Sequence, residues 1–379
     1  MRSIRAATAS LLACAAIAAC LEIGLAFVQP VDPSFVSGCG QVSSVTPLNH
    51  APHAGLIRQQ FGAASSYGAV AGTEYDEVYD ELGIKRSALR PQDGDGNRVL
   101  FMGDSFIEGY DDANTIPQRA YQWIVEHESP NRPLIVLNAA YSSYSPTIFT
   151  VQAKRLLPVL RPDFVVIDVD ETDLFDDAVR YRPFVTRDGE GRIVAVGRNE
   201  QRATLVEGCA AVPGYPLRLL QLGAAAYYRS RLALLDWRER RSEQLFAVAG
   251  ATHPEADPEL SEQMQYFSAT LDELFATLRV HLPARRVLVV RHPHLWHLSH
   301  DGSGPAWNRT VGNLVAAAAA RGGVAFFDAQ DELATRFGAH AERYYWSTAD
   351  MHFNFDGIRA YGELVGRELW RMMGEAGLS

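Results

Sequence analysis

Two short segments, far apart in the sequence, carry the residue types that nucleophilic catalysis needs. The first is Gly103-Asp104-Ser105, which directly follows an apolar run of strand length. The second lies near the C-terminus and contains Asp350 and His352. A serine hydroxyl attacks an acyl group when a base accepts its proton and another group orients that base. These residues therefore suggest Ser105 as nucleophile, His352 as base and Asp350 as the orienting carboxylate.

Each segment also has an ordinary structural explanation. Serine is a favoured residue at the start of a helix, so Ser105 alone is weak evidence of chemistry. Residues 350–357 alone fit a surface loop before the last helix, with Asp356 as its N-cap. The elements that would bring the two segments together therefore decide between these interpretations.

The central pattern is an alternation of strand-like and helix-like segments. Continuous apolar runs, typical of parallel strands covered on both faces, occupy residues 98–104, 134–140, 164–170, 285–293 and 324–329. Helical patterns occupy residues 117–128, 147–160, 261–281, 307–321 and 356–373. This order predicts a doubly wound α/β sheet. Ser105 would then lie at the carboxyl edge of the sheet, where such folds bind their ligands.

One segment interrupts the alternation. About eighty residues, 179–259, separate the third and fourth predicted strands. They include a hairpin pattern in 183–197, with Asp188-Gly189-Glu190-Gly191 at the turn, and a helical pattern over 217–246. We interpret the segment as an insertion that forms a cap or wall over the site.

The two chemical segments together resemble the SGNH, or GDSL, hydrolase family. The GDS sequence follows the first strand, and residues 350–357 read D-x-H-x-N-x-x-G, which most resembles the membrane-anchored bacterial branch with a D-x-H ending. The resemblance covers residues 98–379 without the insertion. It implies a three-layer, flavodoxin-like parallel sheet that cleaves or transfers acyl esters without a metal or organic cofactor. It makes Ser105 the nucleophile, His352 the general base and acid, and Asp350 the orienting carboxylate.

The oxyanion hole that the resemblance implies departs from the family pattern. The family uses the nucleophile's N–H, a glycine N–H after the second strand and an asparagine side chain after the third. The matching positions here are Ser105, Ser143 and Thr172. A lost oxyanion donor costs ~10²–10³ in rate, so these substitutions predict a specialised or inactive member. Asp170 and Glu171 add negative charge near the expected oxyanion, which would oppose catalysis unless they point away.

Three activities stay open at this stage. The first is a serine esterase that transfers the acyl group to water, acting on a small-molecule ester or a cell-envelope glycan. The second is an O-acetyltransferase that acts on an extracytoplasmic polysaccharide and needs a membrane acyl-donor protein. This alternative rests on the two-position spacing from Asp350 to His352, where most of the family has three. The third is a non-catalytic binding module with a degenerate site.

Histidines and acidic residues also gather after two of the predicted strands. The sequence HPHLWHLSHD contains His292, His294, His297 and His300, and we favour a loop rim with Trp296 lining a pocket over a metal site. The acidic stretch contains Asp168, Asp170, Asp173, Asp176 and Asp177, and we favour a solvated loop over a cation site.

The N-terminal residues 1–30 predict export of the remaining chain. Arg2 and Arg5 precede an apolar run over 6–28, which is long enough for a membrane anchor with the body outside. A lipoprotein signal with Cys20 as the lipid-bearing residue, or a cleaved secretory signal, are the alternatives. Each places the body in the periplasm or at the cell surface.

The rest of the sequence fits an exported protein with a substantial core. Cys39 and Cys209, the only cysteines beyond the apolar run, could pair in an oxidising compartment. Residues 31–97 read as a linker and an N-terminal extension, followed by the hydrolase-like domain. The chain has 379 residues, 47% of them hydrophobic. Its formal net charge is −10, so the sequence lacks the excess of basic residues that is typical of nucleic-acid-binding proteins.

Overall fold

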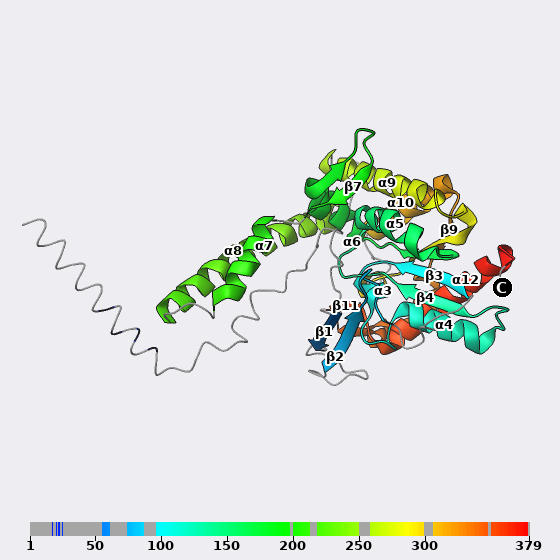
Figure 1. The fold of residues 1–379 in the computed structure, drawn as a ribbon, viewed down its shortest axis with the longest axis horizontal. Coiled ribbons are helices and arrows are strands. Elements are labelled where there is room, and N and C mark those ends of the chain that lie inside the picture. The colour runs from blue at the N-terminus through cyan, green and yellow to red at the C-terminus, as the bar shows by residue number, and fades with distance from the viewer. Residues whose placement is uncertain are drawn as a thin grey trace, which may run out of the picture. The chain divides into compact units, whose positions relative to one another are not determined.

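The chain forms two compact units. The computed structural model describes residues 17, 20, 22, 25, 55–60, 74–86, 96–197, 200–212, 218–249, 258–298, 306–347 and 350–377. One unit combines residues 1–44 with 198–242, and the other combines 45–197 with 243–379. The second unit holds both chemical segments, and its sheet and helices are drawn in Figure 1.

The second unit is built on a five-stranded parallel sheet. In chain order, its strands are β3 (Asn97–Met102), β4 (Leu134–Asn138), β5 (Phe164–Asp168), β8 (Val287–Arg291) and β9 (Ala325–Asp328). Their order in the sheet is β4-β3-β5-β8-β9, with every pair parallel. Numbered along the chain, this is the order 2-1-3-4-5 of flavodoxin-like folds. The predicted sheet is confirmed, and its switch point lies between β3 and β5.

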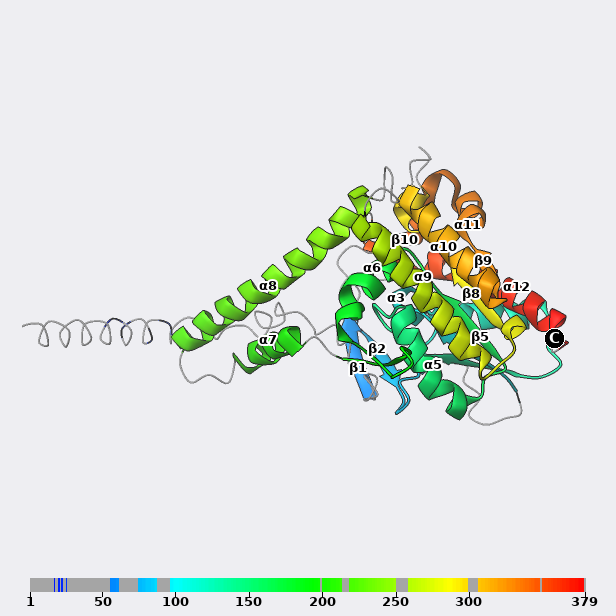
Figure 2. The ribbon, with the colours of Figure 1, turned by 90° about the horizontal axis from the view of Figure 1, so that it is seen from above.

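Helices cover both faces of the sheet and give the three predicted layers (Figures 1 and 2). One face is covered by α5 (Pro146–Leu160), α9 (Pro258–Arg279) and α10 (Ala306–Gly322). The other is covered by α4 (Ile116–His127), α11 (Gln330–Phe337) and α12 (Phe355–Glu375). Leu100 and Met102 of β3 pack in the first core, whereas Val99 and Phe101 pack in the second. This two-sided burial explains why the strands are continuously apolar.

Short elements connect these layers. α3 (Ser105–Glu108) follows β3, and α6 (Thr172–Phe175) follows β5. After α6 come a π-helix η1 (Asp176–Tyr181) and a 3₁₀ turn η2 (Arg182–Phe184). Three further 3₁₀ segments are η5 (Ala284–Arg286) before β8, η6 (Leu295–His297) after β8 and η7 (Gly338–Tyr344) after α11. A small antiparallel pair, β10 (Tyr345–Ser347) and β11 (Asp350–Phe353), precedes α12. The sequence pattern did not predict this pair, which carries His352.

The insertion contains the predicted hairpin and long helix. Strands β6 (Val185–Arg187) and β7 (Ile193–Val196) pair antiparallel, and Asp188 accepts backbone hydrogen bonds from Glu190 and Arg192 at their turn. They are followed by α7 (Glu200–Ala211), which the sequence analysis missed, and α8 (Arg218–Ala249). The role of this segment as a cap stays a prediction.

A small apolar cluster joins the two helices of the insertion. Leu205 and Cys209 of α7 and Leu232 of α8 belong to it. Cys209 is disulfide-bonded. Its predicted partner, Cys39, lies outside the described residues, so that pairing stays a prediction.

The described N-terminal residues include a hairpin, β1 (Gly55–Gln60) and β2 (Glu74–Tyr79). Just after it, the backbone of Lys85 donates to Asn138 at 2.8 Å, and its ammonium donates to the Glu108 carbonyl at 3.1 Å. The extension therefore meets the chain next to α3. Among the described residues, no helix combines the length and the apolar character needed to cross a membrane. The predicted anchor lies mostly outside those residues, and both it and the domain boundaries stay predictions.

Candidate active site

Ser105 lies at the carboxyl end of β3, where the chain turns sharply into α3. Asp104 is the N-cap of α3 and accepts a hydrogen bond from the Phe106 N–H at 2.8 Å. A Cβ at Gly103 would lie 2.5 Å from Ile107 Cγ1, so the tight turn requires glycine there. The Gly-Asp-Ser sequence thus places the serine hydroxyl at the switch point of the sheet, where open α/β folds bind their ligands.

His352 lies on β11, directly before α12. Asn354 is the N-cap of that helix, and its Oδ1 accepts from the N–H groups of Asp356 and Gly357. A Cβ at Gly357 would collide with the carbonyl oxygen of Tyr344. The asparagine and glycine of the D-x-H-x-N-x-x-G pattern therefore fix the backbone that carries the histidine. The expectation that Asp356 caps the helix was wrong, because the Asn354 side chain reaches both free N–H groups.

The fold brings Ser105 and His352 into contact across 247 positions of sequence. Ser105 Oγ lies 2.7 Å from His352 Nε2, within the range of a good hydrogen bond. When Nδ1 carries the ring proton, the hydroxyl donates to Nε2, as a nucleophile does to its base. The side chain of Asp350 lies outside the described residues, so its contact with His352 stays a prediction.

Ser143, at the glycine position of the expected oxyanion hole, has a backbone conformation that favours glycine. Its φ is +63°, in the left-handed region, and its carbonyl accepts a hydrogen bond from the Tyr181 hydroxyl. Left-handed geometry costs a residue with a side chain about 1–2 kcal/mol. The chain therefore keeps the backbone shape of a glycine turn without the glycine. The N–H of Ser143 remains the predicted oxyanion donor.

Thr172 begins α6, beyond the carboxyl end of β5. Its N–H and its hydroxyl both donate to Asp170 Oδ1, each at 2.7 Å. A hydroxyl carries one hydrogen, so in this rotamer Thr172 Oγ1 has none left for a substrate oxygen. Its predicted role as an oxyanion donor would require the side chain to turn away from Asp170.

The histidine and acidic segments meet in the interior, between the ends of neighbouring strands. Asp168 is the last residue of β5 and Asp170 follows it, whereas His292 and His294 follow β8. All four side chains are at most 3% exposed. The expectations of a solvated acidic loop and a histidine rim were therefore wrong. Trp296 is 40% exposed, and its role in lining a pocket stays a prediction. His300 lies outside the described residues.

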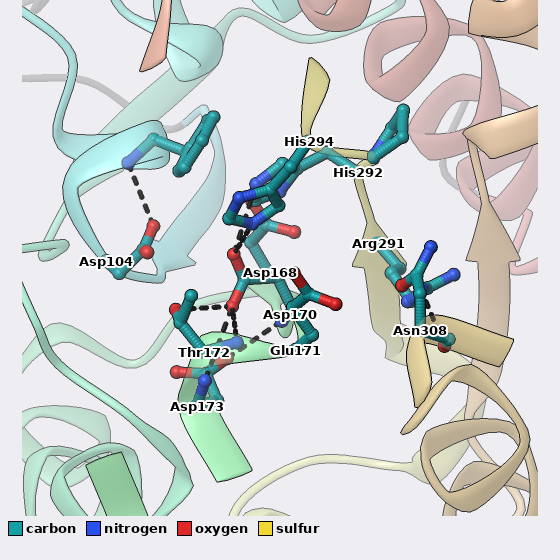
Figure 3. A network of polar contacts seen from close by, with 12 residues as sticks. Asp104, Asp168, Asp170, Glu171, Thr172, Asp173, Arg291, His292, His294 and Asn308 are labelled. Atoms are coloured by element: carbon teal, nitrogen blue, oxygen red, sulfur yellow. Dashed lines mark hydrogen bonds and ion pairs between the residues drawn. The ribbon is translucent and has the colours of Figure 1, made fainter. Parts of the chain in front are cut away.

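A chain of short polar contacts links these four residues (Figure 3). His292 Nδ1 lies 2.9 Å from Asp168 Oδ2, and the Tyr361 hydroxyl donates to the other oxygen of Asp168 at 3.1 Å. His294 Nε2 lies 2.5 Å from Asp170 Oδ2, and His292 Nε2 lies 3.3 Å from the same oxygen. Both imidazole rings thus face one carboxylate oxygen, while Arg291 points away toward Asn308.

The charge of Asp170 is compensated within this group. Burial disfavours its carboxylate, but the charges and hydrogen bonds of His294 and His292 hold its pKa well below the usual range. Burial together with the charge of Asp170 raises the pKa values of Asp104 and Asp173 well above theirs. Of these three buried carboxyl groups, Asp170 is thus the one whose pKa is lowered. The negative charge of Asp170, which was expected to oppose an oxyanion, therefore has two imidazole rings as partners.

Glu171 has its own partners next to this group. Its Oε2 lies 3.0 Å from His297 Nε2, and its Oε1 accepts from the Trp296 indole at 3.0 Å. Burial works against its charge, but the hydrogen bond from His297 lowers its pKa. This carboxylate is thus held by the residues after β8.

Sequence reasoning missed the pairing of the two polar segments. The available signal was a D-x-D pattern at the end of one predicted strand and an H-x-H pattern after the next. Residues 168–170 and 292–294 lie at the carboxyl ends of two strands that pair directly in the sheet. Because parallel strands end at the same edge, the strand order brings these polar residues together.

Comparisons with known proteins find likeness only among solved structures. No protein-family model and no curated protein matches the sequence. A lipase/acylhydrolase from Enterococcus faecalis is 12% identical, with a TM-score of 0.39 over 72% of this chain and 95% of that chain. An α/β hydrolase from a Lake Arreo metagenome is 14% identical, with a TM-score of 0.42 over 72% and 96%. A catalytic mutant of an acetylxylan esterase from Geobacillus stearothermophilus is 12% identical, with a TM-score of 0.43 over 75% and 96%. Values this low leave the chemistry to be argued from the chain's own residues.

Proposed function

We propose that the protein is a serine-dependent hydrolase of the SGNH type that cleaves acyl esters. The observation that carries this proposal is the 2.7 Å contact between Ser105 Oγ and His352 Nε2 at the switch point of the sheet. Asp350 lies two positions before His352 on the same strand and would orient the imidazole. A serine and a histidine from opposite ends of the sequence meet here, on a backbone fixed by glycine and asparagine.

The reaction divides into two acyl transfers. Ser105 Oγ attacks the carbonyl carbon of the ester while His352 Nε2 takes the hydroxyl proton. The bond to the alcohol then breaks, and His352 gives that proton to the departing oxygen. Water attacks the acylated Ser105, His352 takes a proton from the water, and the proton returns to Ser105 Oγ as the acid leaves. One water is consumed, and the protein ends unchanged.

Oxyanion stabilisation is the weak part of this site. The N–H groups of Ser105 and Ser143 are the proposed backbone donors, and Thr172 would add a third only after leaving Asp170. A missing donor costs ~10²–10³ in kcat, so slow turnover of simple esters is expected. An activated ester with a good leaving group is the appropriate first substrate.

The proposed setting is outside the cytoplasm, with the N-terminal segment as anchor. The disulfide at Cys209 supports this setting, because disulfides persist mainly in oxidising compartments. The proposed substrates are small acyl esters or acyl groups on a cell-envelope glycan. Water is the proposed acceptor. The alternative acceptor is a polysaccharide hydroxyl, which would take the acyl group from Ser105 in place of water. The two-position spacing from Asp350 to His352 is the feature that favours this alternative.

Turnover of p-nitrophenyl acetate by the full chain in detergent tests this proposal. Wild-type protein should release nitrophenolate, and Ser105→Ala and His352→Ala should reduce kcat at least 10³-fold. Ser230→Ala, an exposed serine on α8, is the matched control and should keep the wild-type rate. Equal rates in wild type and Ser105→Ala would overturn the proposal.

A further inference from the structure

Asp170, His292 and His294 present three ligand atoms to one small region of the interior. The nearest carboxylate oxygen and ring nitrogens all lie within 4.8 Å of one another. Asp170 Oδ2 is 2.5 Å from His294 Nε2 and 3.3 Å from His292 Nε2. We infer that these three residues form a binding site for one divalent transition metal ion, with Zn²⁺ as the first candidate.

The two carboxylate contacts of His292 require either a second ring proton or a metal ion at this position. Its Nδ1 faces a carboxylate oxygen of Asp168 at 2.9 Å, and a carboxylate only accepts, so Nδ1 must carry the proton. In a neutral ring, Nε2 then points a lone pair toward Asp170 Oδ2. This nitrogen is buried, and it lies 3.3 Å from that carboxylate oxygen. A second proton or a metal ion must therefore lie between the two acceptors.

The donor set suits a transition metal better than calcium or magnesium. Two imidazole nitrogens and one carboxylate oxygen are typical of Zn²⁺ sites, whereas Ca²⁺ and Mg²⁺ take oxygen ligands. Asp168 on the far nitrogen of His292 adds the carboxylate–histidine pairing that usually orients a metal-ligating imidazole. Three protein ligands leave one tetrahedral position open.

The surrounding backbone holds the ligands in place. Asp170 Oδ1 accepts from the N–H and the hydroxyl of Thr172, which leaves Oδ2 to face the histidines. The N–H of His294 donates to His297 Nδ1 at 3.0 Å. The ligands follow two neighbouring strands, and metal binding would move His294 Nε2 and Asp170 Oδ2 apart from their present 2.5 Å.

The inferred site lies beside Ser105 and His352 without including them. The ring of Phe106 lies 3.8 Å from the ring of His292 and 5.0 Å from the ring of His352, measured between centroids. The ion would therefore hold Asp170 and the start of α6 in place next to the catalytic pair. The inference is independent of the proposed esterase activity, because metal binding can be measured without any substrate.

Metal content is the direct test. The full chain, produced without a histidine tag, would be treated with chelator, loaded with ZnCl₂ and passed through a desalting column. Elemental analysis should find one zinc per chain, and added ZnCl₂ should raise the thermal midpoint of the metal-free protein. Less than 0.1 zinc per chain with no change in midpoint would overturn the inference and favour a protonated His292.

Variants test whether the metal binds at these residues. His294→Ala and Asp170→Asn should each lower retained zinc at least tenfold, whereas His281→Ala, an exposed histidine, should retain one equivalent. Zinc retained equally by all three would show that it binds elsewhere and would contradict the assignment. If the ligand variants fail to fold, Co²⁺ added to the wild type decides: intense visible bands support tetrahedral coordination, and the weak spectrum of hydrated cobalt contradicts it.

Discussion

Thr172 Oγ1 donates its hydrogen to Asp170 Oδ1 at 2.7 Å, which directs the hydroxyl into a buried polar group. The proposed oxyanion hole therefore relies on backbone N–H groups. An asparagine at this position is longer and carries two amide hydrogens, so it can keep the contact to Asp170 and still donate to a substrate oxygen.

We therefore expect Thr172→Asn to raise kcat on p-nitrophenyl acetate by at least tenfold, since one oxyanion donor is worth ~10²–10³. The measurement is steady-state kinetics, with Thr335→Asn, an exposed position on α11, as the control. An unchanged kcat in a folded Thr172→Asn protein would contradict the assigned oxyanion position.

Ser143 offers a test of backbone strain. Glycine removes the cost of φ +63° while keeping the N–H, so Ser143→Gly should raise the free energy of unfolding by about 1 kcal/mol. Arg161, at φ +47° in the C-cap of α5, provides an independent comparison, and Arg161→Gly should stabilise similarly. Urea denaturation measures both changes. A loss of stability in Ser143→Gly alone would show that its side chain makes compensating contacts.

Asp177 predicts a pH dependence of stability. Burial raises its pKa to about 7, although hydrogen bonds from the Ser145 hydroxyl and the Thr147 N–H at the start of α5 act to lower it. The folded state then binds this proton more tightly than the unfolded state, whose pKa is near the usual 3.8. The stability that the Asp177 proton adds to the folded state is fully present below pH 3.8, and it is lost as the pH rises from 3.8 to about 7.

The expected size of this effect is at most about 4 kcal/mol. Asp177→Asn cannot titrate, so its stability should fall less than that of the wild type between pH 4 and 7. Denaturation series at several pH values measure the difference. Parallel pH profiles for the two proteins would exclude a raised pKa at Asp177.

Asn354 ties the histidine strand to the last helix. Its Oδ1 caps α12, and its Nδ2 donates to the carbonyl of Arg343 at 2.7 Å. Asn354→Ala removes both and should cost about 2–4 kcal/mol, because buried groups lose their partners. Asn354→Asp keeps the cap but turns a buried carboxylate oxygen toward the carbonyls of Arg343 and Tyr345, so it should also lower the thermal midpoint. If Asn354→Ala has the same thermal unfolding midpoint as the wild type, the structural role of Asn354 is contradicted.

The sheet was predictable because its strands are buried on both faces. The run 164–170 contains the whole of β5, and the run 98–104 contains all of β3 except its first residue, Asn97. The pair β10–β11 was not predictable in this way, because strands of three and four residues are too short for a periodic signal. The same limit applies to α3 and α6, which span one turn each.

The site was only partly predictable for a related reason. Ser105 and His352 were identified by residue type and spacing, and the fold brings them to 2.7 Å. The burial of Asp170 and His294 depends on which strands are neighbours, and local polarity instead suggested exposed loops. The direction of the Thr172 hydroxyl also depends on a neighbour, Asp170, whose orientation no sequence pattern reports.

Covalent labelling tests the central claim most directly. The full chain would be treated with a fluorophosphonate, and the modified residue would be identified by mass spectrometry in wild type, Ser105→Ala and His352→Ala. We predict labelling at Ser105 in the wild type, none in Ser105→Ala and strongly reduced labelling in His352→Ala. A folded wild-type protein that remains unlabelled, or one labelled at another residue, would contradict an activated Ser105.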